Sequence, residues 1–160
     1  MTTCCKKLAT VLTIALAIVF IVTLLDIYSA TQIWQPVGGW EGATYKSVEQ
    51  PFLTLFWAFV YFMIFLCALT YYLVRKDKSE AIAITATSYI LISSGLEDLL
   101  FYKLQNIPLE NMTWFINTPM GFTSKYILGL DTVTPIGLII NIILFGIAGI
   151  LLAKYLITKW

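Results

Sequence analysis

Four long apolar stretches, separated by polar or turn-rich segments, set the pattern of this chain. They cover residues 8–28, 49–74, 79–104 and 134–157. A helix needs about 20 apolar residues to cross the hydrocarbon core of a membrane, and each stretch meets that length. The pattern predicts an all-α integral membrane protein. Residues 1–160 then form a single membrane domain, an up-down bundle of four transmembrane helices.

The first apolar stretch follows a short basic tail, an arrangement that a secretory signal peptide shares. Its apolar run is longer than the core of a signal peptide, and Asp26 lies near its end. Tyr28 stands where cleavage requires a small residue. We therefore expect this stretch to remain as a membrane anchor.

Two polar segments predict where helices begin. Ser47 can cap a helix, Gln50 follows three residues later, and Pro51 is tolerated in a first turn. Asp77 and Glu80 repeat the capping-box spacing before the third apolar stretch. We expect the second and third helices to begin at these two positions.

Small residues mark two helix faces for close packing. Ala81, Ala83 and Ser88 lie in the first half of the third stretch, and Gly149 and Ala153 are spaced four apart in the fourth. Small side chains let membrane helices approach closely. Each face is predicted to pack against another helix of this chain or of a partner.

Two longer connections, residues 28–50 and 103–133, join the apolar stretches. Trp34 and Trp40 lie in the first, where we expect an aromatic belt at the headgroup level, with ligand contact as the alternative. The second carries apolar pieces such as residues 112–116, which a polar coil would not contain. It predicts an interfacial helix or a re-entrant segment between the third and fourth helices.

Lysine and arginine are unevenly distributed among the connecting segments. Of the ten in the chain, seven lie in the N-terminal tail, in the turn after the second stretch or near the C-terminal end. The positive-inside rule therefore predicts a multi-pass protein with both termini in the cytoplasm. The connections 28–50 and 103–133 would lie outside.

Two short patterns are compatible with modification. Asn111, Met112 and Thr113 match an N-glycosylation acceptor on the predicted outer side, which is consistent with the predicted topology. Cys4 and Cys5, beside basic residues and a membrane helix, are expected to be two idle reduced thiols, with palmitoylation in a eukaryotic host as the alternative.

Composition narrows the classes of function. Hydrophobic residues make up 59% of the chain and charged residues 12%, so membrane lipids are the expected surroundings. A net charge of +1 offers no basis for binding nucleic acid. The chain has no histidine, and its three cysteines lack metal-ligand spacing. We therefore expect neither a metal site nor a cofactor.

Four polar side chains fall in the outer half of the predicted helices: Asp26, Glu97, Asp98 and Asn141. At a rise of about 1.5 Å per residue, Asp26 and Glu97 lie at a similar height in the outer leaflet. Antiparallel neighbours bring the three carboxylates and the amide into one layer. Ionisable groups within membrane helices commonly serve a function. We predict that these four residues bind a ligand.

Glu97 and Asp98 cannot both point to the same place, because adjacent helical residues diverge by about 100°. We expect Glu97 to face the interior and Asp98 to reach for the headgroups or the connection. The alternative is that all three acids cap helices or extend to water at helix ends.

Three functions remain open for this site. The first is binding or helping to transport a cation, a proton or a lipid-like ligand, for which four helices would need a homo-oligomer or a larger membrane complex. The second is a structural subunit that docks onto a membrane partner through its small-residue faces. The third is a lipid or isoprenoid isomerase or cyclase that uses a membrane carboxylic acid.

Two short likenesses favour the enzyme hypothesis. Glu97 and Asp98, followed by Phe101 and Tyr102, resemble the paired-acid-then-aromatics run of membrane lycopene cyclases, although Gly95 stands where that pattern has proline. The size and the membrane acids are also similar to those of the sterol-isomerase-like sigma-2 receptor superfamily. The catalytic members of that superfamily carry a histidine that this chain lacks. Neither likeness is taken as membership, and no residue is assigned a catalytic role.

Overall fold

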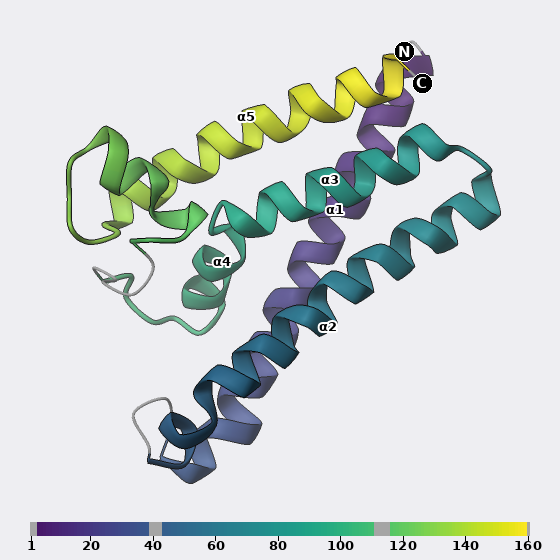
Figure 1. Ribbon diagram of the computed structural model, residues 1–160. Coiled ribbons are helices and arrows are strands. Elements are labelled where there is room, and N and C mark those ends of the chain that lie inside the picture. The colour runs from purple at the N-terminus through teal and green to yellow at the C-terminus, as the bar shows by residue number, and fades with distance from the viewer. Residues whose placement is uncertain (1–2, 39–42, 111–115, 160) are drawn as a thin grey trace.

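The computed structural model describes residues 3–38, 43–110 and 116–159, with the backbone alone described for residues 43–50. Figure 1 shows that the described chain is built from helices. The five α-helices are α1 (Thr3–Tyr28), α2 (Ala43–Arg75), α3 (Lys78–Ser93), α4 (Leu96–Leu104) and α5 (Pro135–Lys159). The predicted all-α class is thereby confirmed.

Within the described residues, three helical segments are long and apolar enough to cross a membrane. They are Thr3–Val37, which joins α1 to the short helical turns after it, Pro51–Arg75 of α2, and Pro135–Lys159 of α5. These segments coincide with the first, second and fourth apolar stretches of the sequence. They agree with the prediction of a helical membrane protein.

The third apolar stretch is broken, which corrects the single helix predicted over residues 79–104. It forms α3 and α4 on either side of Ser94 and Gly95. Gly95 has a φ of +88°, in the left-handed region that favours glycine. The 16 residues of α3 reach about 24 Å, which is short of the hydrocarbon core of about 30 Å.

Helix α3 lies at the centre of the arrangement and packs against α1, α2 and α5. Its Ala83 and Ser88 are fully buried, and so is Ala153 of α5. A Cβ added to Gly149 of α5 would already lie 3.5 Å from the Cγ2 of Ile90. The two small-residue faces predicted from the sequence therefore pack within this chain, where their small side chains permit close contact.

Both termini lie at the same end of the molecule, as Figure 1 shows. The turn between α2 and α3 lies at this end as well, since Lys7 of α1 forms an ion pair with Asp77 of the turn. This grouping matches the segments that the charge count assigns to one side.

Helix α3 begins where the sequence predicted, whereas α2 begins earlier than predicted. Asp77 caps α3 as predicted, because its side chain accepts a hydrogen bond from the Glu80 N–H at 3.0 Å. Helix α2 begins at Ala43, before the predicted start at Ser47, and Pro51 consequently lies inside the helix. The residues before Pro51 extend the helix by two turns at its N-terminal end.

Trp34 differs from the aromatic belt predicted for the first connection. Its side chain is 6% exposed, and its indole N–H donates to the Ser29 hydroxyl at 3.1 Å. Its ring meets that of Phe52 edge to face, with centroids 4.6 Å apart. The turns that continue α1 fold this tryptophan inward, against the start of the apolar part of α2. Trp40, the other predicted belt residue, lies outside the described residues.

The second connection folds back onto the end of α5. A 3-10 turn, Pro119–Gly121, and a π-helical turn, Thr123–Ile127, bury Met120, Thr123 and Ser124. The glycosylation acceptor at Asn111 lies outside the described residues.

Candidate functional site

Asp26 lies on the face of α1 that packs inward. One turn before it, Val22 is 3% exposed, and nearly one turn after it, Ser29 is 4% exposed. Residues three or four apart share a helix face, so this spacing gives Asp26 the same orientation. Its side chain is half-buried where α1 packs against α4.

The break between α3 and α4 is held by local hydrogen bonds. The Ser94 hydroxyl donates to the Leu91 carbonyl at 2.6 Å, and the Gly95 N–H donates to the Ile92 carbonyl at 3.0 Å. The new helix begins when the Leu99 N–H donates to the Gly95 carbonyl, also at 3.0 Å. These bonds give partners to the carbonyls of Leu91, Ile92 and Gly95 at the break.

The left-handed turn at Gly95 also permits close packing. A Cβ at this position would lie 2.4 Å from the Cδ1 of Leu138 and 2.7 Å from the Cγ of Met120. Only glycine therefore fits between α5 and the second connection. The turn redirects the chain so that α4 packs against α1 instead of continuing along α5.

Glu97 is the most unusual residue of this region. It lies in the first turn of α4 and is 3% exposed. Its Oε1 has no hydrogen-bond partner among the residues that the structure describes. A buried polar atom normally has a partner, because losing water without gaining a hydrogen bond costs free energy.

Two further carboxyl groups lie within electrostatic range of Glu97. They are Asp98, which is next in the chain, and Asp26 of α1. Asp98 also interacts with Asp26, and its side chain is half-buried. The structure therefore brings together all three predicted acids, which we call the carboxyl cluster (Asp26, Glu97 and Asp98).

Asn141 joins several elements near the helix break. It is fully buried, and its side-chain N–H groups donate to the Ser94 carbonyl at 3.0 Å and the Pro119 carbonyl at 3.3 Å. Its oxygen accepts from the Thr123 hydroxyl at 2.8 Å and from the Thr123 N–H at 3.3 Å. Both amide hydrogens are thus engaged, and the side chain ties α5 to the end of α3 and to the second connection.

The sequence did not reveal these partners of Asn141. Thr123 is fully buried, yet it belongs to a connection without helical periodicity. The nearest signal was the small residue Gly137, where a Cβ would lie 2.1 Å from the Ser124 Oγ. Such a contact is visible only once the connection is folded onto α5.

The described cavities lie away from the carboxyl cluster. A groove of about 470 Å³ lies between α1 and α2. A second cavity, of about 290 Å³, lies in the second connection and is lined by Ile116, Asn117, Thr118, Pro119, Phe122, Lys125 and Tyr126. Neither is lined by Asp26, Glu97 or Asp98. Within the described ranges, no three acidic, cysteine or histidine side chains are arranged to hold a metal ion.

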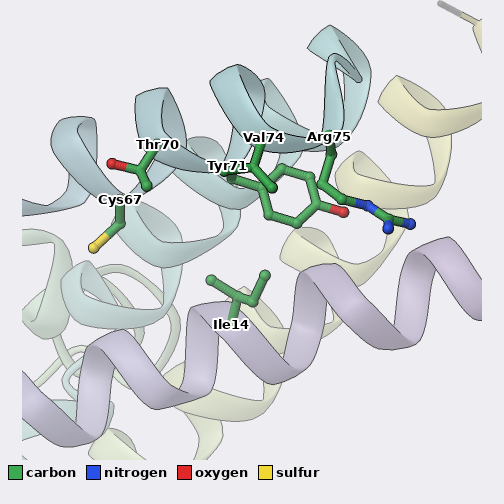
Figure 2. A pocket seen from close by; sticks show the side chains of 6 residues that line it. All are labelled: Ile14, Cys67, Thr70, Tyr71, Val74 and Arg75. Atoms are coloured by element: carbon green, nitrogen blue, oxygen red, sulfur yellow. The ribbon is translucent and has the colours of Figure 1, made fainter.

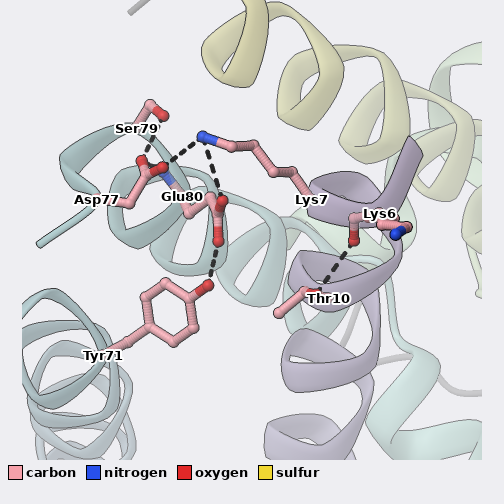
Figure 3. A network of polar contacts seen from close by, with 7 residues as sticks. All are labelled: Lys6, Lys7, Thr10, Tyr71, Asp77, Ser79 and Glu80. Carbon is pink, nitrogen blue, oxygen red and sulfur yellow. Dashed lines mark hydrogen bonds and ion pairs between the residues drawn. The ribbon is translucent and has the colours of Figure 1, made fainter. Parts of the chain in front are cut away.

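A second polar group, drawn in Figure 3, lies at the end of the bundle that holds both termini. Lys7 forms ion pairs with Asp77 and, at 3.3 Å, with Glu80, and the Tyr71 hydroxyl donates to Glu80. The Ser79 hydroxyl donates to Asp77 at 2.6 Å. This clamp (Lys7, Tyr71, Asp77, Ser79 and Glu80) ties α1, α2 and α3 together.

The clamp changes the acidity of its most accessible acid. The hydrogen bond from Lys7, followed by that from Ser79, holds the pKa of the Asp77 carboxyl well below its usual range. Sequence reasoning identified the capping role of Asp77 but not Lys7 as its partner, because the two residues are far apart in the chain.

Comparison with protein-family models, with curated proteins and with solved structures found no match to this chain.

Proposed function

We propose that this chain is an integral membrane protein that takes up a proton at Glu97. Asp26 and Asp98 are the neighbouring carboxyl groups whose charges the proton offsets. In this proposal α1, α2 and α5 cross the membrane, and α3 with α4 forms a broken fourth crossing. Both termini lie on the cytoplasmic side, as the positive-inside rule predicts.

The observation that carries the proposal is the buried Glu97 side chain without a partner for its Oε1. An ionised carboxylate buried in this way loses the solvation of water, and its Oε1 gains no hydrogen bond in return. Asp26 and Asp98 add like charges nearby. Binding a proton removes the charge of Glu97 and both of these costs.

The helix break supports the same function. Broken helices in membrane proteins commonly lie at ion sites, where the interrupted backbone and the helix ends contact the ion. Here the break at Ser94 and Gly95 directly precedes Glu97.

A proton fits the site better than a metal ion does. A metal ion needs several ligands at short distances, and the carboxyl cluster does not provide that arrangement. A proton needs one carboxyl oxygen. The docking-subunit alternative also loses its main support, since the small-residue faces from which it was predicted pack within the chain.

A hydrophobic carbodiimide tests the proposal, because it reacts with protonated carboxyl groups in apolar surroundings. We expect mass spectrometry of the protein labelled in liposomes to find the adduct on Glu97 and to find that labelling falls as the pH rises. Exposed Glu110 is the internal control and should stay unlabelled. Equal labelling of Glu97 and Glu110, or no adduct on Glu97, would contradict proton uptake at this site.

A further inference from the structure

An open groove between α1 and α2 lies close to the end of the molecule that holds both termini. Its volume is about 470 Å³. Figure 2 shows Ile14 of α1 facing the side chains of α2 across it. The lining is apolar along its length and ends at a single guanidinium group; the lining residues are Ile14, Cys67, Thr70, Tyr71, Val74 and Arg75.

The groove opens to the surroundings of the protein. Thr70 and Arg75 are exposed, and Val74 is 74% exposed. Cys67 lies eight residues before Arg75, and eight residues of helix span about 12 Å. This length matches most of the hydrocarbon depth of one leaflet, about 15 Å. The groove therefore has the length and the apolar lining that suit an acyl chain.

Positive charge gathers at the mouth of the groove. Arg75 lies beside the Tyr71 hydroxyl, and Lys76 follows it in the chain and is exposed. The nearby acids Asp77 and Glu80 form their ion pairs with Lys7. Among the described ion pairs none includes Arg75, so its charge is available to an anion.

We propose that the groove holds one acyl chain of an anionic phospholipid whose phosphate contacts Arg75. A guanidinium group offers two parallel N–H donors to phosphate oxygens. Lys76, whose Nζ lies over the Tyr72 ring, adds a second positive charge to this end of α2 and disfavours zwitterionic headgroups, which carry a cation next to the phosphate. The apolar lining accommodates an acyl chain and the cationic mouth binds a phosphate. Together they favour an anionic lipid over a free anion.

The test uses the purified full-length protein in nanodiscs that contain phosphatidylglycerol and phosphatidylcholine in equal amounts. Lipid retained after transfer to detergent is counted by native mass spectrometry. We expect wild-type protein to retain phosphatidylglycerol preferentially. Arg75→Gln should reduce that preference by about tenfold, the loss expected for one charge-assisted contact. Arg75→Lys should keep part of it.

Two further variants separate the groove from general charge. Thr70→Trp fills the groove from an exposed position and should abolish retention while Arg75 is intact. Val74→Trp serves the same purpose if Thr70→Trp fails to fold. Lys154→Gln removes an exposed charge of α5 near the same end and should leave retention unchanged.

Several results would overturn this proposal. They are equal retention of the two lipids by wild type, an unchanged preference in Arg75→Gln, and an equal loss in Lys154→Gln. Retention that survives a folded, groove-filling tryptophan would show that the lipid binds elsewhere. Displacement of the lipid by millimolar inorganic phosphate would show that the headgroup contact alone is responsible.

Discussion

Glu97 and Asn141 are both buried polar residues, yet the structure treats them in opposite ways. Asn141 is fully buried and has partners for both its N–H groups and its oxygen. Glu97 is 3% exposed, and its Oε1 has no partner among the described residues. A satisfied buried amide stabilises the fold, whereas a buried carboxyl oxygen without a partner costs free energy, which the proposed proton uptake would reduce.

The sequence predicted that these two residues and Asp26 lie near the same level of the bundle. It also favoured Glu97 over Asp98 as the inward-facing acid, and Glu97 is the more buried of the two. The sequence could not predict that Asn141 has hydrogen-bond partners while Glu97 Oε1 lacks one. Partners of Asn141 come from the irregular connection around Thr123. The ligand-binding role of the four residues stays a prediction.

Replacement of Asn141 by alanine should destabilise the protein by about 2–6 kcal/mol. The change leaves the buried Ser94 carbonyl and the Thr123 hydroxyl without their partner, at about 1–3 kcal/mol for each group. Unfolding in detergent measures the loss. Asn117→Ala, which removes an exposed acceptor of Lys125, is the matched control and should change stability little. An equal effect of the two variants would contradict the structural role of Asn141.

At the scale of elements, the break in the third apolar stretch decides where the carboxyl cluster lies. Hydrophobicity alone predicted one continuous helix, since the stretch remains apolar across Ser94 and Gly95. The reason for the break lies elsewhere in the chain, in Met120 and Leu138, which occupy the space beside Gly95. Helix lengths could therefore be predicted from the sequence, but this interruption could not.

Gly95→Ala should destabilise the protein, because its Cβ would overlap Leu138 and Met120 and its φ of +88° disfavours alanine. The backbone term alone is about 1–2 kcal/mol, and the overlap adds to it. Gly146→Ala is the matched control on α5. A Cβ there meets no atom within 4 Å, so it should be neutral or stabilising by up to about 1 kcal/mol. Thermal unfolding of both variants, with opposite signs expected, checks the argument.

At the scale of the whole molecule, the clamp lies at one end of the bundle, and the carboxyl cluster lies at the level of α4, away from that end. The clamp lies with both termini, and Figure 1 shows α1 and α2 continuing past the level of α4 at the other end. The charge count anticipated which segments share an end. It did not anticipate the pairing of Lys7 with Asp77 and Glu80, because contacts between distant segments leave no periodic signal in one sequence.

The clamp predicts an acid-sensitive part of the stability. The pKa of Asp77 is lower in the folded state than the value of about 3.9 in an unfolded chain. The ionised Asp77 carboxylate therefore contributes fully to the stability of the folded state above that value. This contribution is lost as the pH falls toward the pKa of Asp77 in the folded state. Asp77→Asn keeps the helix cap, so it should remove only this pH dependence, worth about 1 kcal/mol for a partly exposed pair.

The free energy of unfolding in detergent, measured between about pH 6 and about pH 3, checks this prediction. This range extends above and below the pKa of an aspartate in an unfolded chain. Wild type should lose more stability on acidification than Asp77→Asn does. Asp131→Asn, at an exposed position, should behave as wild type. Parallel curves for wild type and Asp77→Asn would show that the ion pair with Lys7 contributes nothing.

The central claim is that Glu97 carries a proton inside the bundle, and infrared spectroscopy measures this most directly. A protonated carboxyl group in apolar surroundings gives a C=O stretching band that a carboxylate lacks. We predict this band in wild-type protein in lipid at neutral pH, its loss in Glu97→Gln and its persistence in Glu110→Gln. A band that survives in folded Glu97→Gln, or that is missing from wild type, would contradict the account.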